Sequence, residues 1–190
     1  MIDVLCKQAV GEKAAVACFY LDFAAQEEQS PAAILGSVLK QVVGGLDEIP
    51  ERIVKAFRDR ERVIGGQGLA LAEIVEFLQD ISSSSLRTFI CIDALDECPA
   101  GHRVNLLDSL NEILQKSPSA RIFLTGRPHI RTEVEKHFAG RVATRSITPT
   151  KDDIVIFLRA KLKEDAMPEA MDESLKEEII KAIPETVSEM

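Results

Sequence analysis

Residues 88–98 read Thr-Phe-Ile-Cys-Ile-Asp-Ala-Leu-Asp-Glu-Cys, and this stretch decides the fold. Its residues 89–92 are all apolar, which predicts a strand buried on both sides in a parallel sheet covered by helices. Three carboxylates follow, those of Asp93, Asp96 and Glu97. Ligands of open α/β sheets bind outside the carboxyl ends of the strands, so we expect Asp93 at the rim of a crevice. Carboxylates placed there are suited to holding Mg²⁺ beside a substrate's phosphates.

A second strand end carries matching polar groups. Residues 121–125 form another apolar run, which ends in Thr125-Gly126-Arg127-Pro128. If the two strands are neighbours, Thr125 and Arg127 face the same crevice as Asp93, and together these groups suit phosphate chemistry. The alternative is that the acidic residues begin a solvated loop and that Arg127 belongs to a surface ion pair. The two features together favour the functional interpretation.

Strands and helices alternate along the chain, which predicts an α/β fold with a parallel sheet. We expect strands at 14–23, 88–93, 121–125 and 141–147. We expect helices at 1–10, 31–43, 48–62, 69–81, 103–114, 130–138, 152–162 and 172–183. The apolar spacing within two of these helices predicts that Phe57 and Val104 face the core. Residues 1–150 are therefore expected to form the α/β core, and residues 151–190 to begin a helical region.

Composition excludes several classes of function. The formal net charge of −8 argues against a nucleic-acid-binding surface. No apolar run approaches the length of roughly 18 residues that a membrane span needs. The four cysteines show no CxxC spacing, which favours free thiols in a reducing cytosol over a zinc site or a disulfide framework. We therefore expect a cytoplasmic protein without nucleic-acid or membrane partners.

The pattern Asp-Ala-Leu-Asp-Glu at 93–97, followed by Arg-Ile-Phe-Leu-Thr-Gly-Arg-Pro-His at 121–129, resembles the Walker B and sensor 1 segments of NACHT-type STAND NTPases. Fungal NLR-like and nephrocystin-like N-terminal NTPase domains are the members it resembles in particular. Residues 15–23, 30–43 and 147–162 also resemble segments of that family. The resemblance implies a P-loop NTPase core of the AAA+-like, STAND type, followed by a helical extension.

The resemblance also implies roles for individual residues. Asp93 would hold Mg²⁺, and Glu97, with Asp96 as the competing choice, would polarise the attacking water. Arg127 would sense the γ-phosphate of ATP or GTP, with Thr125 beside it. Members of this class hydrolyse nucleotide slowly and act as conformational switches that oligomerise after nucleotide exchange, so self-association and protein partners are expected.

One family motif does not occur in the sequence. The Walker A pattern G-x-x-x-x-G-K-[ST], whose backbone amides and Lys cradle the phosphates, is not found in the 190 residues. Its place would fall just before Met1, because residues 1–10 resemble the helix that the P-loop opens. We therefore expect a NACHT core cut at both ends, with poor nucleotide binding by these residues alone. The alternative is a nucleotide-free adaptor or remnant that acts through protein contacts; an unrelated α/β hydrolase ranks below both, since no nucleophile motif is present.

Overall fold

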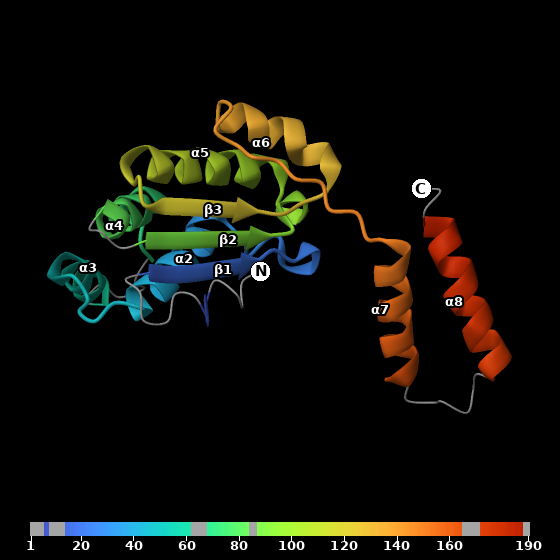
Figure 1. The fold of residues 1–190 in the computed structure, drawn as a ribbon. Helices are drawn as coiled ribbons and strands as arrows, with labels where there is room; N and C mark the ends of the chain where they lie inside the picture. Colours follow the sequence, from blue (N-terminus) through green and yellow to red (C-terminus); the bar gives the residue numbers. More distant parts are fainter. Residues whose placement is uncertain (1–5, 8–13, 62–67, 84–86, 165–171, 188–190) are drawn as a thin grey trace. The chain divides into compact units, whose positions relative to one another are not determined.

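The computed structural model describes residues 6–7, 14–61, 68–83, 87–164 and 172–187. The chain divides into two compact units, residues 1–142 and residues 143–190. The first holds the sheet and its helices, and the second holds two helices (Figure 1). Most of the helix expected at 1–10 lies outside the described residues.

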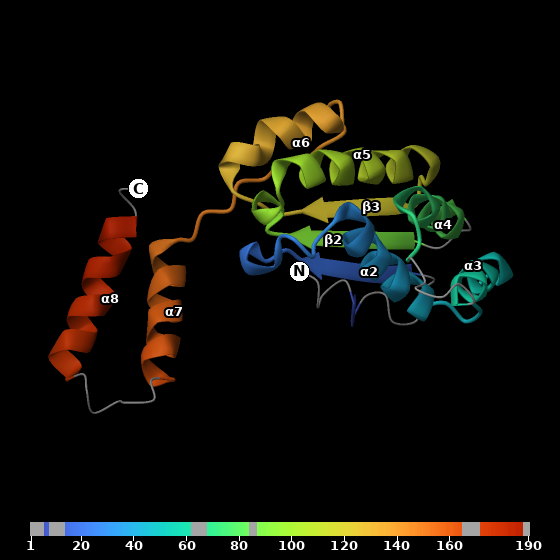
Figure 2. The same cartoon turned by 180° about the vertical axis from the view of Figure 1, so that it is seen from behind.

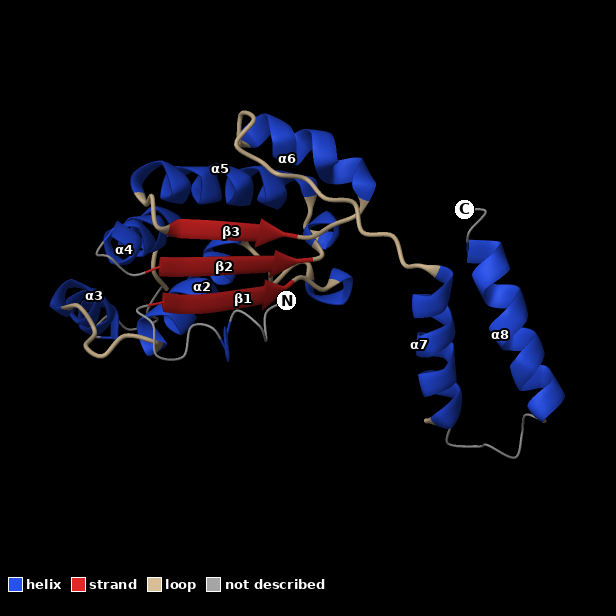
Figure 3. Ribbon diagram, viewed as in Figure 1, coloured by secondary structure: helices blue, strands red, loops and turns tan. Residues whose placement is uncertain are grey.

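Within the described residues, three parallel strands form the sheet, in the order β1-β2-β3 (Figure 3). They are β1 (Ala14–Tyr20), β2 (Arg87–Asp93) and β3 (Ala120–Leu124). Asp93 pairs with Tyr20 at the end of β1, and Ile92 pairs with Leu124 at the end of β3. The predicted α/β class with a parallel sheet is confirmed, and the carboxyl ends of all three strands meet at one edge of the sheet.

The complete α-helices among the described residues of this unit are α2 (Pro31–Gly44), α3 (Glu51–Glu61), α4 (Leu71–Ser83), α5 (Ala100–Lys116) and α6 (Arg131–His137). The start of α2 follows from its sequence. The Ser30 side chain accepts a hydrogen bond from the Ala33 backbone N–H at 3.2 Å, and Pro31 occupies the first turn. A capped start with proline in the first turn is favourable because Pro lacks the N–H that a helix start leaves unpaired.

The connecting helices lie on one face of the sheet. When parallel strands follow one another in sequential order, right-handed crossovers bring every connecting helix to the same side. Accordingly, α4 packs between α2 and α5. Figure 1 looks onto the strands, and Figure 2, from behind, shows α2 crossing in front of them. The fully buried residues between these two layers include Ala17, Leu78, Ile90, Leu107 and Leu110.

The opposite face of the sheet is less deeply buried. Val16, Phe89 and Phe123 are half-buried, and the rings of Phe89 and Phe123 lie 6.4 Å apart. The sequence predicted that β2 is buried on both sides. Ile90, Cys91 and Ile92 are buried, but Phe89 is only partly so.

The strand expected at 141–147 is absent, since residues 141–150 are in extended or irregular backbone. Its apolar Ile147 is 88% exposed. A strand needs a neighbouring strand to pair its N–H and C=O groups, and within the described residues β3 pairs only with β2. Two side chains expected to face the core are also exposed, Phe57 at 51% and Val104 at 39%.

The second unit consists of α7 (Lys151–Lys163) and α8 (Glu173–Val187), which pack against each other. The Thr150 side chain accepts from the Asp153 backbone N–H, and the Asp153 carboxylate accepts from the Thr150 backbone N–H. This reciprocal capping box fixes the start of α7. Among the described residues, no helix combines the length and the apolar character that crossing a bilayer requires.

Candidate functional site at the carboxyl ends of the strands

Asp93 and Thr125 are joined across the ends of β2 and β3. The Thr125 hydroxyl donates a hydrogen bond to Asp93 Oδ1 and accepts one from the Ala94 backbone N–H at 3.1 Å. The Thr125 N–H donates to the Ile92 carbonyl at 3.0 Å, and the Leu95 N–H donates to the Thr125 carbonyl at 2.9 Å. The ladder between the two strands thus continues past their ends and fixes the position of the Asp93 carboxylate.

The chain turns sharply after Asp93. Ala94 has φ 56° and ψ 43°, in the left-handed region that non-glycine residues seldom adopt. This turn starts a 3₁₀ turn at Leu95–Glu97, and Leu95 is fully buried while Asp96 and Glu97 stay at the rim. A left-handed alanine costs roughly 1–2 kcal/mol, and such strain gathers where a side chain must be aimed.

Asp96 holds the segment that follows β3. Its carboxylate accepts a hydrogen bond from the Arg127 backbone N–H at 3.1 Å and lies 3.4 Å from Arg127 Nε. The Asp96 side chain is only 9% exposed, whereas that of Arg127 is 76% exposed. The guanidinium is therefore held at one nitrogen and otherwise faces solvent, where an anionic group can reach it.

Glu97 reaches the loop that follows β1. Its Oε2 accepts a hydrogen bond from the Phe23 backbone N–H at 2.8 Å, and its carbonyl accepts one from Gln26 Nε2 at 2.7 Å. Phe23 opens a 3₁₀ turn at Phe23–Ala25, which Asp22 caps by accepting from the Ala24 N–H at 2.9 Å. All three strand ends therefore contribute to one cluster of polar groups.

The structure thus brings together all five residues that the sequence singled out: Asp93, Asp96, Glu97, Thr125 and Arg127. Sequence reasoning did not include the loop at 22–26. The strand expected at 14–23 ends at Tyr20 in the structure, and the carboxylate of Asp22 at the end of that apolar run is the signal that could have marked the loop. That loop adds a fourth carboxylate, that of Asp22, to this edge of the sheet.

The donor atoms suit a hard cation. Within the described residues, no three His, Cys, Asp or Glu side chains are arranged to enclose a metal ion. Mg²⁺ does not require such a cage, because it keeps several waters and is usually bound by one or two carboxylates plus phosphate oxygens. The Asp93 carboxylate, with the Thr125 hydroxyl on one of its oxygens, fits that mode of binding.

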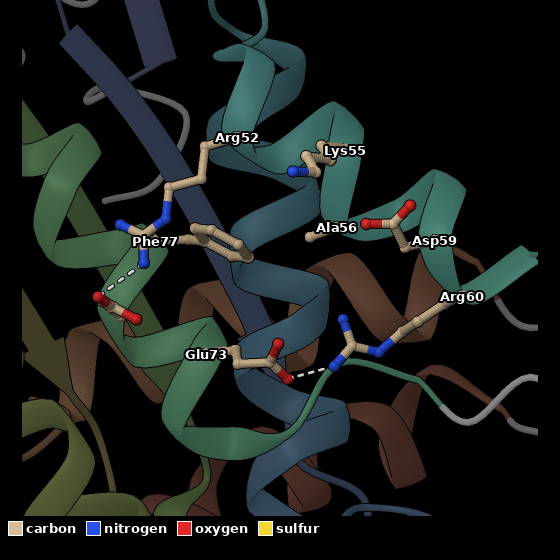
Figure 4. A pocket seen from close by; sticks show the side chains of 8 residues that line it. Arg52, Lys55, Ala56, Asp59, Arg60, Glu73 and Phe77 are labelled. Atoms are coloured by element: carbon tan, nitrogen blue, oxygen red, sulfur yellow. Dashed lines mark hydrogen bonds and ion pairs between the residues drawn. The ribbon is translucent and has the colours of Figure 1, made fainter.

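A separate hollow of about 470 Å³ lies between α3 and α4 (Figure 4). Four of the charged side chains that line it form ion pairs with one another. Arg52 contacts Glu76 at 2.6 Å and lies 5.2 Å from the Phe77 ring centre, and Arg60 pairs with Glu73. The hydrogen bond with Glu76 raises the pKa of Arg52. The pKa of Glu73 is lowered by the Ala70 N–H first and then by Arg60. These pairs tether α3 to α4, and none of the predicted site residues lines the hollow.

Comparison with known proteins gives one family. The sequence model of the nephrocystin 3 N-terminal region matches residues 1–127. Among curated proteins, none matches. Among solved structures, a Walker-type ATPase of Pyrococcus abyssi is similar, with a TM-score of 0.43 and 14% identity over 96% of this chain. The chain spans 63% of that protein's length.

Proposed function

Since the chain belongs to the nephrocystin 3 N-terminal family, we propose that the edge built by Asp93, Glu97 and Arg127 is the Mg²⁺- and γ-phosphate-facing half of a STAND-type nucleotide switch. The observation that carries this proposal is the convergence of Asp93, Thr125, Asp96 and Arg127 at the carboxyl ends of two neighbouring parallel strands. Ligands of such sheets bind at this edge. ATP or GTP is the nucleotide class, and oligomerisation is the output.

The local contacts distinguish the roles. Asp93 is the metal ligand, since its Oδ1 is oriented by the Thr125 hydroxyl and hard oxygen donors suit Mg²⁺. The bound ion would screen phosphate charge. Arg127, mostly exposed and held through Nε, pairs with the terminal phosphate. Asp96 is a positioning residue for Arg127 because both of its contacts go to that residue.

Glu97 is the better candidate of the two acidic residues for polarising water. Asp96 is 9% exposed and committed to Arg127, whereas the Glu97 carboxylate is held by one backbone N–H, that of Phe23. Releasing that single contact frees the carboxylate to accept a proton from water. In the state described here, the Glu97 carboxylate binds the loop that follows β1 instead.

One observation favours the second candidate function, a nucleotide-free adaptor that works through protein contacts. Each of the three carboxylates already has a protein donor: the Thr125 hydroxyl, the Arg127 N–H or the Phe23 N–H. A nucleotide complex must compete with these contacts, and the 190 residues contain no Walker A motif to supply phosphate-binding amides and a lysine.

Titration of the chain with a fluorescent ATP analogue, with and without Mg²⁺, tests whether these 190 residues bind nucleotide by themselves. We expect weak binding, in the millimolar range or weaker, for the 190 residues alone. The matched control is Asp47→Asn, which removes one exposed carboxylate that forms no hydrogen bond or ion pair within the described residues. Micromolar binding that Asp93→Asn abolishes and Asp47→Asn preserves would show that these residues suffice for nucleotide binding.

A longer protein of the same family that carries a Walker A motif tests the roles. There, the substitution matching Glu97→Gln should slow hydrolysis by about 100-fold or more, the range for loss of a general base, and leave binding intact. The substitution matching Asp93→Asn should remove the Mg²⁺ dependence of binding. Normal turnover in both variants contradicts the proposed function.

A further inference from the structure

Two cysteines lie directly opposite each other in the sheet. Cys18 of β1 is the register partner of Cys91 of β2, and both are free thiols. Side chains of register partners in parallel strands point to the same face, and the strands lie about 4.8 Å apart. Disulfides span Cα separations of roughly 4.4–6.8 Å, so the backbone already stands within the range that a bond between these two sulfurs requires.

The pair lies on the face of the sheet that faces away from the connecting helices. Cys18 alternates along β1 with Ala15 and Ala17, whose side chains point into the helix-covered core. Cys18 is half-buried and Cys91 is 4% exposed. A small oxidant can therefore reach the Cys18 sulfur. Cys91 is buried beside it and would react second.

Gln41 of α2 holds Cys18 in place. Its Oε1 accepts from the Cys18 backbone N–H at 3.0 Å and from the thiol at 3.8 Å, and its Nε2 donates to the Cys18 carbonyl at 2.8 Å. Cys18 therefore turns its backbone groups away from β2 toward this amide. These contacts orient Cys18 within β1.

The electrostatic environment supports the proximity of the thiols. Burial raises the pKa of the Cys91 thiol first, and the neighbouring thiols of Cys18 and Cys6 raise it further. Two such groups resist ionising together, because each thiolate disfavours the other. Cys98, which is also buried, has its pKa raised by burial but has no cysteine beside it.

We propose that Cys18 and Cys91 form a reversible disulfide that links β1 to β2 when the protein meets a peroxide. The Cys18 sulfur attacks hydrogen peroxide, the O–O bond breaks, and a sulfenic acid and one water are formed. The Cys91 sulfur then attacks the sulfenic sulfur; the S–S bond forms and the S–O bond breaks, and the hydroxyl leaves with the Cys91 proton as a second water. Peroxide is reduced by two electrons, and a dithiol reverses the reaction.

The disulfide between Cys18 and Cys91 would change the position of β1 beside the candidate site at Asp93 and Glu97. A disulfide brings the two Cβ atoms to about 3.8 Å, closer than the strand spacing of about 4.8 Å, so β1 must shift toward β2. Among the described strands β1 is at the edge of the sheet and can shift more readily than β2. Cys91 lies two residues before Asp93 on β2, and β1 leads directly into Phe23, the donor to Glu97.

Peroxide treatment of the folded chain, followed by alkylation and peptide mapping by mass spectrometry without reduction, tests the proposal. We expect a loss of two free thiols per chain and a single cross-link between the peptides that hold Cys18 and Cys91. Mapping the wild-type protein makes the result independent of how any variant folds. The same treatment in denaturant should give no preference for this pair.

Variants sharpen the assignment. Cys98→Ala is the matched control, since it removes a buried thiol with no cysteine opposite and should form the cross-link as the wild type does. Cys18→Ala and Cys91→Ala should each prevent it. A wild-type protein that keeps all its thiols under conditions that oxidise a control dithiol overturns the proposal. So does a cross-link that involves Cys6, or one that joins two copies of the chain.

Discussion

Gly126→Ala should destabilise the chain through one close contact. A Cβ atom at this position would lie 2.6 Å from Ile130 Cδ1 and 3.3 Å from both Ile130 Cγ1 and Asp96 Oδ1. Carbon atoms do not approach to the first of these distances, and Ile130 is only 5% exposed, so its side chain must turn within a packed site. A forced rotamer costs roughly 0.5–1.5 kcal/mol and overpacking roughly 1–3 kcal/mol, so we expect a loss of about 1–2 kcal/mol.

The Ile130→Val substitution tests the cause, because it removes the Cδ1 atom that the new methyl group meets. By itself it should cost about 0.5–1.5 kcal/mol, as such truncations do. In the I130V background the alanine at 126 should then cost less than about 0.5 kcal/mol. The coupling free energy between the two sites should therefore be about 1 kcal/mol, well above the error of additivity for independent sites.

Urea unfolding followed by circular dichroism measures these differences as shifts in the transition midpoint at constant slope. Gly101→Ala is the control, because nothing lies within 4 Å of its added Cβ and alanine is the better residue within α5. If Gly126→Ala is as stable as Gly101→Ala, or loses as much stability in the I130V background as in the wild type, the steric argument is wrong.

Two further predictions follow from burial and capping. Leu110→Ala should cost about 2–5 kcal/mol because Leu110 is fully buried, whereas Val104→Ala, 39% exposed, should cost less than about 0.5 kcal/mol; comparable losses in urea unfolding would contradict the burial pattern of α5. The Thr150 hydroxyl and then its N–H lower the pKa of Asp153 below its ordinary 3.8, so this carboxylate stabilises α7 above that pH and loses its effect as the pH falls through the lowered pKa. The helical signal of the wild type should therefore exceed that of Asp153→Asn at neutral pH and converge with it in acid, and a pH-independent difference would rule out the charge as the cause.

Local patterns in the sequence predicted the elements that carry the site. The cap of α2 depends on adjacent residues, Ser30 and Pro31, and β2 on an uninterrupted apolar run, so neighbours along the chain suffice to predict both. The meeting of Asp93 and Thr125 needed one more step, that β2 and β3 are neighbours in a parallel sheet. Right-handed connection through a single helix, α5, makes that pairing the expected one.

Local sequence patterns did not predict the contacts between segments that are distant along the chain. The Glu97 carboxylate is bound by the backbone N–H of Phe23, and every residue except proline has such a group, so nothing in the residue type marks the partner. Phe57 and Val104 were expected to face the core because apolar spacing fits one face of each helix. Which apolar side chain is buried depends on the neighbouring elements. On α5, Leu106 is fully buried and Val104 is exposed.

The strand expected at 141–147 is the plainest case in which local sequence patterns did not predict the structure. Its apolar residues have the β propensity that the sequence suggested, but propensity reflects a fit to a half-buried sheet and does not supply a partner. A strand in water gains stability only when its N–H and C=O groups pair with another strand. Within the described residues β3 pairs with β2 alone, and Ile147 stays 88% exposed. The conformation of residues 141–147 therefore depends on whether a partner strand is present and not on the propensity of the segment alone.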